Sequence, residues 1–239
     1  QALVDELHRA GVDAHPGTLA PEAVRAPGAD PRRLAAVNEG RARPQDEASM
    51  VVAHETQAAS GERVLEVGAG PGGKATHLAA MVGRTGEVVA VELHPHRSRL
   101  VREAAAQLGV TLDVRTGDAT DPSTLAPLGD FDAVLVDAPC SDLGVGRRRP
   151  EIRWRRRPED VVALSDLQRR LLHPAADRVK PGGRLVYAVC TWTRAETVGQ
   201  VRRLLAERDD LELELERQLL PDLDGTDGMY LARFRRAVA

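Results

Sequence analysis

The sequence of 239 residues contains only two cysteines, Cys140 and Cys190, and no long apolar run. Two cysteines that lie far apart in the sequence do not form the framework of a disulfide-rich secreted domain. A helix that crosses a membrane needs about 20 consecutive apolar residues, and no segment approaches that length. The amino end, which is mixed and partly acidic, lacks the pattern of a secretory signal. We therefore expect a reduced, cytoplasmic protein with no membrane partner.

The sequence also lacks a strong excess of either charge, because its formal net charge is −3. Total charge therefore does not by itself indicate a nucleic-acid partner. The hydrophobic share of 42% supports a substantial core. The length suits one large domain, or a domain with an appendage, at about 150 residues per domain. The chain begins with Gln1 rather than Met, so we expect the natural protein to extend further upstream.

A glycine-rich turn is the feature around which the rest of the sequence is organised. Four of the six residues from Gly68 to Gly73 are glycine, and they follow an apolar strand and precede a helix that begins near Lys74. Glycine allows a sharp turn and lets a ligand approach the backbone closely. In an open α/β sheet, such a turn at the carboxyl end of the first strand binds nucleotide-like ligands. The spacing G-x-G-x-G-G differs from the dinucleotide fingerprint, so the turn alone is a weak motif.

Two acidic residues at the ends of later strands strengthen this interpretation. The apolar segment 87–91 ends at Glu92, which lies about 20 residues beyond the glycine turn, where an acid accepts hydrogen bonds from ribose hydroxyls. The alternative is a surface loop followed by an ordinary exposed glutamate. The third strand ends near Asp118, which is placed either to accept from an adenine amino group or to cap a helix.

The pattern of apolar segments predicts an α/β fold. Strands and helices alternate, which indicates a mostly parallel sheet with helices on both faces. The predicted strands are 63–68, 87–92, 111–116, 131–137 and 183–189, and the predicted helices are 74–82, 96–108, 159–179 and 194–208. Two more strands, at 211–215 and 227–234, complete a sheet of seven, with the last strand antiparallel at or near an edge.

Residues 1–48 differ from the rest of the chain, because prolines and glycines interrupt them after a short helix at 2–10. We predict that they form a small appended subdomain or the tail of one. Residues 49–239 then form the main domain, which a helix at 50–59 opens.

Each cysteine directly follows a predicted strand. Cys140 closes the segment Asp137-Ala138-Pro139-Cys140, and Cys190 follows Val189. The carboxyl ends of parallel strands meet at one edge of a sheet, so we expect both thiols beside the glycine turn. A free cysteine is otherwise typical of a small buried hydrophobe. A zinc pair is a further alternative, but the seven histidines are scattered and no second pair of ligands has metal spacing, so we predict no metal.

An arginine-rich segment follows the first cysteine. Residues 147–157 include seven arginines together with Trp154. Arginine binds phosphates and tryptophan stacks on bases, although a run of charge is also typical of a solvated face. We predict that this segment binds RNA through Arg147, Arg148, Arg149, Arg153, Trp154 and Arg155.

These motifs together resemble the RsmB-like, or Sun/Fmu, family of RNA cytosine carbon-5 methyltransferases. The resemblance extends over most of the chain through segments 45–49, 69–74, 137–144, 149–154, 180–183, 187–191 and 224–230, with Glu196 between the last two. A pair of such cysteine motifs in this order is specific. Asp142 stands where the family more often has glycine, Ala75 replaces a usual threonine, and Met229-Tyr230 replaces a usual aromatic pair.

The resemblance implies a Rossmann-like class I methyltransferase fold, S-adenosylmethionine as the methyl donor, and RNA, expected to be ribosomal, as the substrate. It also implies that residues 1–48 are part of an amino-terminal RNA-binding subdomain. It implies that Cys190 adds to carbon 6 of cytosine, that Cys140 removes the carbon-5 proton and assists release, and that Asp137 hydrogen-bonds the base. Lys74 would stabilise negative charge there, or would be a solvated helix residue. The implied cofactor contacts are Gly68, Ala69, Gly70, Pro71, Gly72, Gly73, Lys74, Glu92, Arg97, Asp118 and Asp137.

Three other functions remain open at this point. An NAD-binding enzyme fits the glycine turn but leaves the two cysteines unexplained. A methyltransferase that acts on another nucleophile would contain the cysteines incidentally. A non-catalytic RNA-binding or ribosome assembly module would retain only the fold. In each case we expect a monomer.

Overall fold

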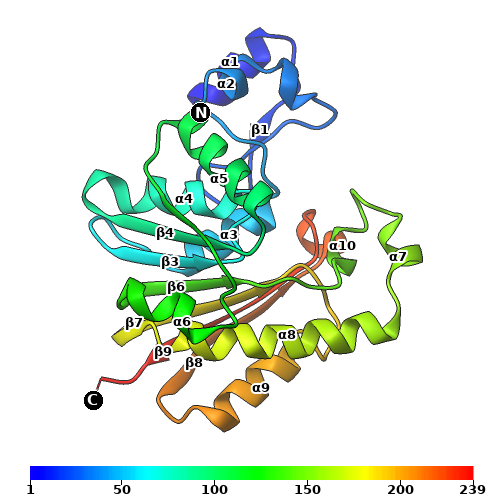
Figure 1. Cartoon of the computed structure of the whole chain (residues 1–239). Coiled ribbons are helices and arrows are strands. Elements are labelled where there is room, and N and C mark those ends of the chain that lie inside the picture. Colours follow the sequence, from blue (N-terminus) through cyan, green and yellow to red (C-terminus); the bar gives the residue numbers. More distant parts are fainter. Residues whose placement is uncertain (239) are drawn as a thin grey trace.

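In the computed structural model, which describes residues 1–238, a seven-stranded sheet runs through most of the chain (Figure 1). Every strand runs parallel to the others except β9, which is antiparallel to both of its neighbours. The strands lie in the order β5 (Asp113–Thr116), β4 (Glu87–Glu92), β3 (Arg63–Val67), β6 (Phe131–Asp137), β7 (Val179–Val189), β9 (Met229–Arg236) and β8 (Leu211–Leu219). The predicted mostly parallel sheet of seven strands is confirmed.

Helices cover both faces of the sheet (Figure 1). One face carries α3 (Glu47–Glu55), α4 (Gly73–Val82) and α5 (Pro95–Leu108), and the other carries α6 (Pro122–Leu125), α8 (Pro158–Ala176) and α9 (Val198–Glu207). Successive side chains of a strand point to opposite faces. In β3, Leu65 therefore joins the core beneath α8 and α9, whereas Val64 joins the core beneath α3 and α4.

Several helices begin or end at residues other than the predicted ones, and each difference has a local cause. The helix expected over 159–179 ends at Ala176, because Val179 already pairs with Phe131 in the sheet. The helix expected from residue 194 begins only at Val198, because the residues before it form a turn around the buried side chain of Glu196. The helix expected from residue 50 begins at Glu47, because the Asp46 carboxylate accepts a hydrogen bond from the Ala48 N–H at 3.0 Å and caps it. The last strand lies beside the edge strand β8 rather than at the edge itself.

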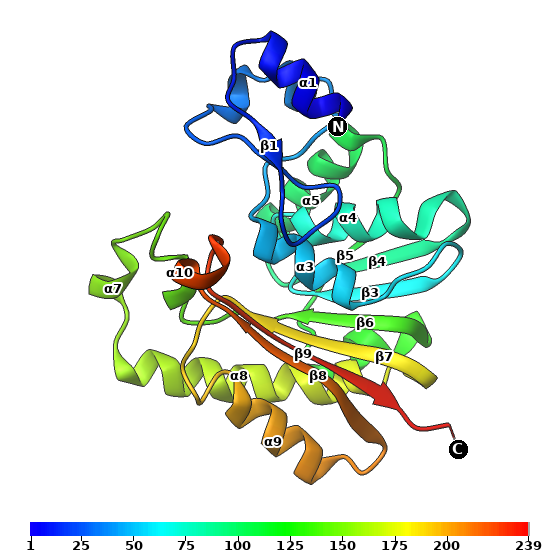
Figure 2. The same cartoon turned by 180° about the vertical axis from the view of Figure 1, so that it is seen from behind.

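The first 46 residues form a small lobe over the face that carries α3, α4 and α5 (Figure 2). The lobe contains α1 (Ala2–Arg9), the two-stranded hairpin of β1 (His15–Pro16) and β2 (Val24–Arg25), and α2 (Ala35–Asn38). Glu47, at the start of α3, holds the hairpin: its carboxylate accepts from the Ala20 N–H at 3.0 Å and from Arg25 Nε at 2.7 Å. The remaining short elements are η1 (Pro31–Arg33), η2 (Gly83–Thr85), η3 (Ala126–Leu128), η4 (Leu143–Val145), α7 (Ile152–Arg155) and α10 (Pro221–Asp224).

The parallel register brings the carboxyl ends of β3, β4, β6 and β7 to one edge of the sheet. The glycine turn between β3 and α4 fits there only without a side chain. At Gly68, where φ is +84°, a Cβ atom would lie 2.2 Å from the carbonyl oxygen of Asp137 at the end of β6. Glycine is thus required where the two strands come closest. Within the described residues, no helix combines the length and the apolar character needed to span a membrane.

Candidate active site

A cavity of about 590 Å³ opens at this edge of the sheet. This volume lies in the range that is usual for small-molecule and cofactor sites. Its wall contains residues from every strand end named above, among them Gly68, Gly70, Lys74, Glu92, Arg97, Asp118, Asp137, Cys140, Asp142 and Cys190. The topology therefore brings both cysteines and seven of the eleven predicted cofactor residues to one cavity, whereas Ala69, Pro71, Gly72 and Gly73 are not part of its wall.

The part of the cavity next to β4 has the features of a nucleoside site. The buried carboxylate of Glu92 accepts hydrogen bonds from the backbone N–H groups of Gly70 and His94, both at 3.0 Å. Arg97 donates to the Gly70 carbonyl and so fixes the turn. A Cβ atom at Gly70 would lie 2.6 Å from the Glu92 carboxylate, so only glycine allows this contact. The large apolar side chain of Leu93 is 53% exposed in the same wall, as expected where a flat heterocycle packs.

Asp118 lies in the same part of the cavity wall. Asp118 is exposed, and its Oδ1 accepts from the Thr120 N–H at 2.9 Å and from the Thr120 hydroxyl at 2.7 Å. These bonds cap a turn and leave the second carboxylate oxygen facing solvent or a ligand. The hydrogen bonds from Thr120 hold the pKa of Asp118 below its ordinary value, so the group is an acceptor at neutral pH.

A buried ion pair lies between the glycine turn and the cysteines. The Lys74 ammonium is 2.8 Å from the Asp137 Oδ2 atom, and only 11% of the Lys74 side chain is exposed. Lys74 is therefore not a solvated helix residue. Burial by itself would lower the pKa of Lys74. The Asp137 carboxylate raises this pKa by more than burial lowers it, so the pKa lies above its ordinary value. A fixed positive charge is thus present in the wall of the cavity.

The two cysteine sulfur atoms face each other at 3.1 Å. Cys140 is buried, with 5% of its surface exposed, whereas Cys190 is more accessible. Its hydrogen bond with Cys190 and its burial, together with the nearby negative charge of Asp142, raise the pKa of the Cys140 thiol well above its ordinary value. Both cysteines line the cavity, and Cys190 is the more accessible of the two.

The loops that carry the cysteines are tied together by one buried carboxylate. Glu196 accepts from the Ser141 N–H at 2.8 Å, from the Ser141 hydroxyl at 2.6 Å and from the Gln168 amide at 3.0 Å. It also accepts from the Thr193 hydroxyl at 2.7 Å. Glu196 thus links the loop after β6, the loop after β7 and helix α8, and it sets the relative positions of the two thiols.

The arginine-rich segment divides into two groups. Arg147 pairs with Asp46 at 2.9 Å, and Arg148 pairs with Asp227, so both fasten the segment to the body of the protein. Arg149, Arg153, Trp154 and Arg155 lie on the exposed side around α7, and the Trp154 side chain is 81% exposed. The Arg153 guanidinium lies 5.5 Å from the centre of the Trp154 ring. The segment therefore presents a flat aromatic surface among positive charges.

Three residues of the site do not follow from the sequence reasoning. Asp142 is expected only as a departure from the family pattern, but its carboxylate contacts both cysteines. Arg156 belongs to the arginine run and pairs with Asp142 at 3.0 Å instead of facing outward. Glu66 lies within an apolar strand and is fully buried beside the Lys74–Asp137 pair. A charged residue within a buried strand was the one signal in the sequence for Glu66.

The sheet order, the glycine turn and the cavity define a Rossmann-like class I methyltransferase fold, whose cofactor is S-adenosylmethionine. Residues 53–235 match the family model described as 16S rRNA methyltransferase RsmB/F. The chain belongs to this family.

Similar proteins agree with this assignment. The Bacillus subtilis protein named probable ribosomal RNA small subunit methyltransferase B is 34% identical over 98% of this chain and 56% of its own length. The Mycobacterium tuberculosis protein named putative methyltransferase MT1451 is 43% identical over 97% of this chain and 54% of its own length. The crystal structure of NSun6 from Pyrococcus horikoshii with SFG is 27% identical, with a TM-score of 0.80 over 90% of this chain and 58% of that chain. The chain thus spans little more than half the length of each of these three proteins.

Proposed function

We propose that this chain is the catalytic part of an S-adenosylmethionine-dependent methyltransferase that modifies carbon 5 of cytosine in ribosomal RNA. The observation that carries the proposal is the pair of sulfur atoms, 3.1 Å apart, in the wall of the cavity that the glycine turn also lines. The name of the Bacillus subtilis relative supports ribosomal RNA as the substrate. Residues 1–48 would act as the appendage and residues 49–239 as the methyltransferase domain.

The residues around the glycine turn fit the cofactor. The turn from Gly68 to Lys74 would hold its amino-acid part, and Arg97 keeps the Gly70 carbonyl in place. Glu92 would accept from the ribose hydroxyls, Asp118 from the adenine amino group, and Leu93 would cover the adenine ring. When bound, the cofactor supplies an electrophilic methyl group.

Cytosine carbon 5 is a weak nucleophile, and the role of the thiol is to activate it. The thiolate of Cys190 adds to carbon 6, and the electron pair of the former double bond moves into the ring and makes carbon 5 nucleophilic. The Lys74 ammonium would stabilise the negative charge that the thiolate brings into the ring. Asp137 would accept a hydrogen bond from the cytosine amino group and so orient the base. The base must be unpaired or flipped out for carbon 6 to reach Cys190.

After methylation, carbon 5 still carries its proton, and the base is still bonded to Cys190. The thiolate of Cys140 would take this proton, the double bond would re-form, and the carbon–sulfur bond would break to free Cys190. The raised pKa of Cys140 makes its thiolate a strong base but leaves few thiolates at neutral pH, so this step should become faster as the pH rises. The accessible thiol thus attacks and the buried thiol assists release.

The test compares Cys190→Ala and Cys140→Ala in the same RNA methylation assay. Cys190→Ala should abolish methyl transfer, because no sulfur then adds to carbon 6. Cys140→Ala should form the adduct but release it slowly, so that protein and RNA migrate together in a denaturing gel. Full methyl transfer by Cys190→Ala would instead indicate a methyltransferase that acts on another nucleophile.

A further inference from the structure

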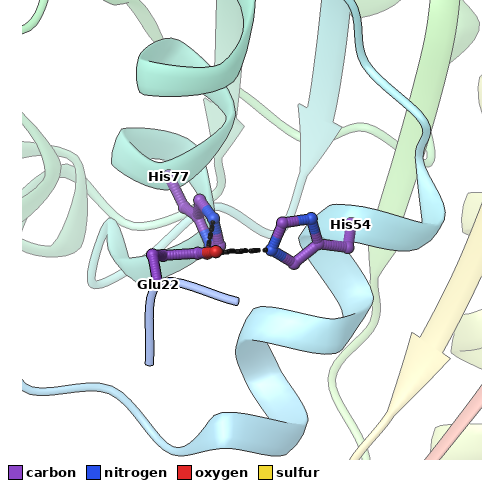
Figure 3. Close-up of side chains that lie close together, drawn as sticks. All are labelled: Glu22, His54 and His77. Carbon is purple, nitrogen blue, oxygen red and sulfur yellow. Dashed lines mark hydrogen bonds and ion pairs between the residues drawn. The ribbon is translucent and has the colours of Figure 1, made fainter. Parts of the chain in front are cut away.

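Two histidines and a glutamate meet at the junction of the amino-terminal lobe with the helices of the main domain (Figure 3). Glu22 lies in the loop between β1 and β2, His54 is in α3, and His77 is in α4. Their side chains converge although they lie far apart in the sequence. None of the three lines the cavity that holds the cysteines.

The ligand atoms of the three side chains point at one another. The Nε2 atom of His54 lies 2.8 and 3.0 Å from the two carboxylate oxygens of Glu22, and the Nε2 atom of His77 lies 2.6 Å from Oε1. The two imidazole rings are perpendicular, at 88°, with centroids 5.1 Å apart. All three ligand atoms lie within 4.8 Å of one another. A single small ion between them can reach all three.

The donor set is one that zinc prefers. Two imidazole nitrogens and one carboxylate, with water in the fourth position, form a known type of tetrahedral zinc site. With metal–ligand bonds of about 2.0–2.1 Å, tetrahedral ligand atoms are separated by roughly 3.3 Å. The carboxylate must therefore move outward by roughly 0.5–0.7 Å from its present 2.6 and 2.8 Å separations, which a surface loop permits. His77 is largely buried, with 11% of its side chain exposed, whereas Glu22 is 44% exposed, so one side remains open to water.

The protonation states also suit a cation. Histidine binds metal in its neutral form, and burial lowers the pKa of His77 below its ordinary value. Burial opposes ionisation of Glu22, but hydrogen bonds from the backbone and from His54 outweigh it, so its pKa is lowered and the group is a carboxylate. One negative charge thus faces two imidazoles.

We propose that Glu22, His54 and His77 bind one zinc-type divalent ion, with water as the fourth ligand. The ion would fasten the β1–β2 hairpin to α3 and α4. Because α4 begins at the glycine turn, the ion would connect the lobe to the helix that supports the cofactor site. Its role is structural and is separate from methyl transfer.

A second group of metal-ligating side chains lies in the cavity, so a zinc-binding experiment must distinguish the two groups. Cys140, Asp142 and Cys190 also lie within reach of one ion, and thiolates bind zinc well. Any zinc uptake must therefore be assigned to one of the two groups. Sulfur distinguishes them, because a zinc–sulfur bond of about 2.3 Å is longer than a bond to nitrogen or oxygen.

The experiment titrates zinc chloride into the chelator-treated full chain by calorimetry. We expect one ion per chain, with affinity at least about tenfold weaker in His54→Ala and in Glu22→Gln. Glu22→Gln keeps the size of the side chain and removes its charge, so it is the milder change. His173→Ala is the matched control, because His173 forms a single pair with Glu207 at 2.7 Å with similar exposure and no second histidine. Its zinc affinity should equal that of the wild type.

Two further measurements decide the outcome. X-ray absorption at the zinc edge should show only nitrogen and oxygen ligands, and a sulfur shell would assign the ion to the cysteines and overturn the proposal. Zinc should also raise the Tm of the wild type more than that of Glu22→Gln. Folded wild-type protein that takes up no zinc, or wild-type affinity in both ligand variants, would likewise overturn it.

Discussion

The Oδ1 atom of Asp142 lies 3.2 Å from the sulfur of Cys190, so a carboxylate faces the proposed nucleophile. Asp142 has a left-handed backbone, with φ of +59°, which glycine adopts freely and aspartate tolerates better than most residues. This conformation explains how aspartate can occupy a position where the resemblance to the family leads us to expect glycine. The same side chain lies 3.6 Å from Cys140, and Arg156 holds its other oxygen at 3.0 Å.

Asp142→Asn should make the proposed methyl transfer less dependent on high pH. A negative charge beside a thiol disfavours the thiolate, so removing the charge lowers the pKa of Cys140 from its raised position. The alkaline rise of the pH–rate profile should therefore move to lower pH, and the rate at neutral pH should increase several-fold. Asp209→Asn, an exposed change, is the control. A profile that does not move would show that Asp142 has no influence on the thiols.

Glu66→Gln should remove one component of the pH dependence of stability. Burial and the nearby Asp137 raise the pKa of Glu66 well above its ordinary value of 4.5, so the folded protein keeps it neutral. The folded state then binds more protons than the unfolded state, and stability falls as pH rises above the ordinary value toward the folded-state pKa. The Tm of the variant should match the wild type near pH 4 and exceed it at higher pH. Exposed Glu212→Gln should follow the wild type at every pH, and a Glu66→Gln curve that does the same would contradict this assignment.

Glu196→Ala should destabilise the protein by about 3 kcal/mol, because it leaves buried donors of Ser141, Gln168 and Thr193 without their acceptor. It should also lower methyl transfer by more than the loss of folded protein explains, because the two cysteine loops lose their common anchor. Urea unfolding measures the first effect. Glu207→Ala is the comparison, since Glu207 pairs with Arg169 and His173 at the surface and its removal should cost much less. Equal losses of unfolding free energy in the two variants would show that Glu196 contributes no more to stability than an exposed glutamate.

Much of this arrangement could be predicted because the pattern of short apolar strands specifies a parallel sheet. Once the sheet is parallel, the carboxyl ends of its strands share an edge, and the convergence of the glycine turn, Glu92, Asp137 and the cysteines follows from topology. The prediction that the final strand is antiparallel and lies at or near an edge is also confirmed. These predictions depend on backbone geometry and require no knowledge of side-chain contacts.

The parts that could not be predicted depend on which side chains meet across the fold. Nothing in the sequence shows that Arg147 pairs with Asp46 and Arg148 with Asp227. Nor does it show that two histidines that lie apart in the sequence converge on Glu22. Such pairs form between residues far apart in the chain, so neither spacing nor periodicity records them.

Trp154→Ala should weaken binding of single-stranded RNA by about 1–3 kcal/mol, because stacking of a base on an aromatic ring contributes roughly that amount. The side chain is 81% exposed and contacts Arg153, so its removal should leave folding intact. Fluorescence anisotropy with labelled RNA measures the affinity, and Trp154→Phe should retain much of it. Val238 is an exposed apolar residue near the carboxyl terminus, and Val238→Ala should leave RNA affinity unchanged. An unchanged affinity in Trp154→Ala would indicate a solvated face.

Lys74→Met separates the structural role of the Lys74–Asp137 pair from its role in the reaction. Removing Lys74 leaves the Asp137 carboxylate unpaired and partly buried, so the variant should lose about 3–5 kcal/mol of stability. Adding Asp137→Asn removes the stranded charge, so the double variant should regain most of this stability in urea unfolding. If Lys74 stabilises the charge that Cys190 brings into the cytosine ring, methyl transfer should stay low in the double variant even though its fold is restored. Recovery of activity together with stability would mean that Lys74 acts only by neutralising Asp137.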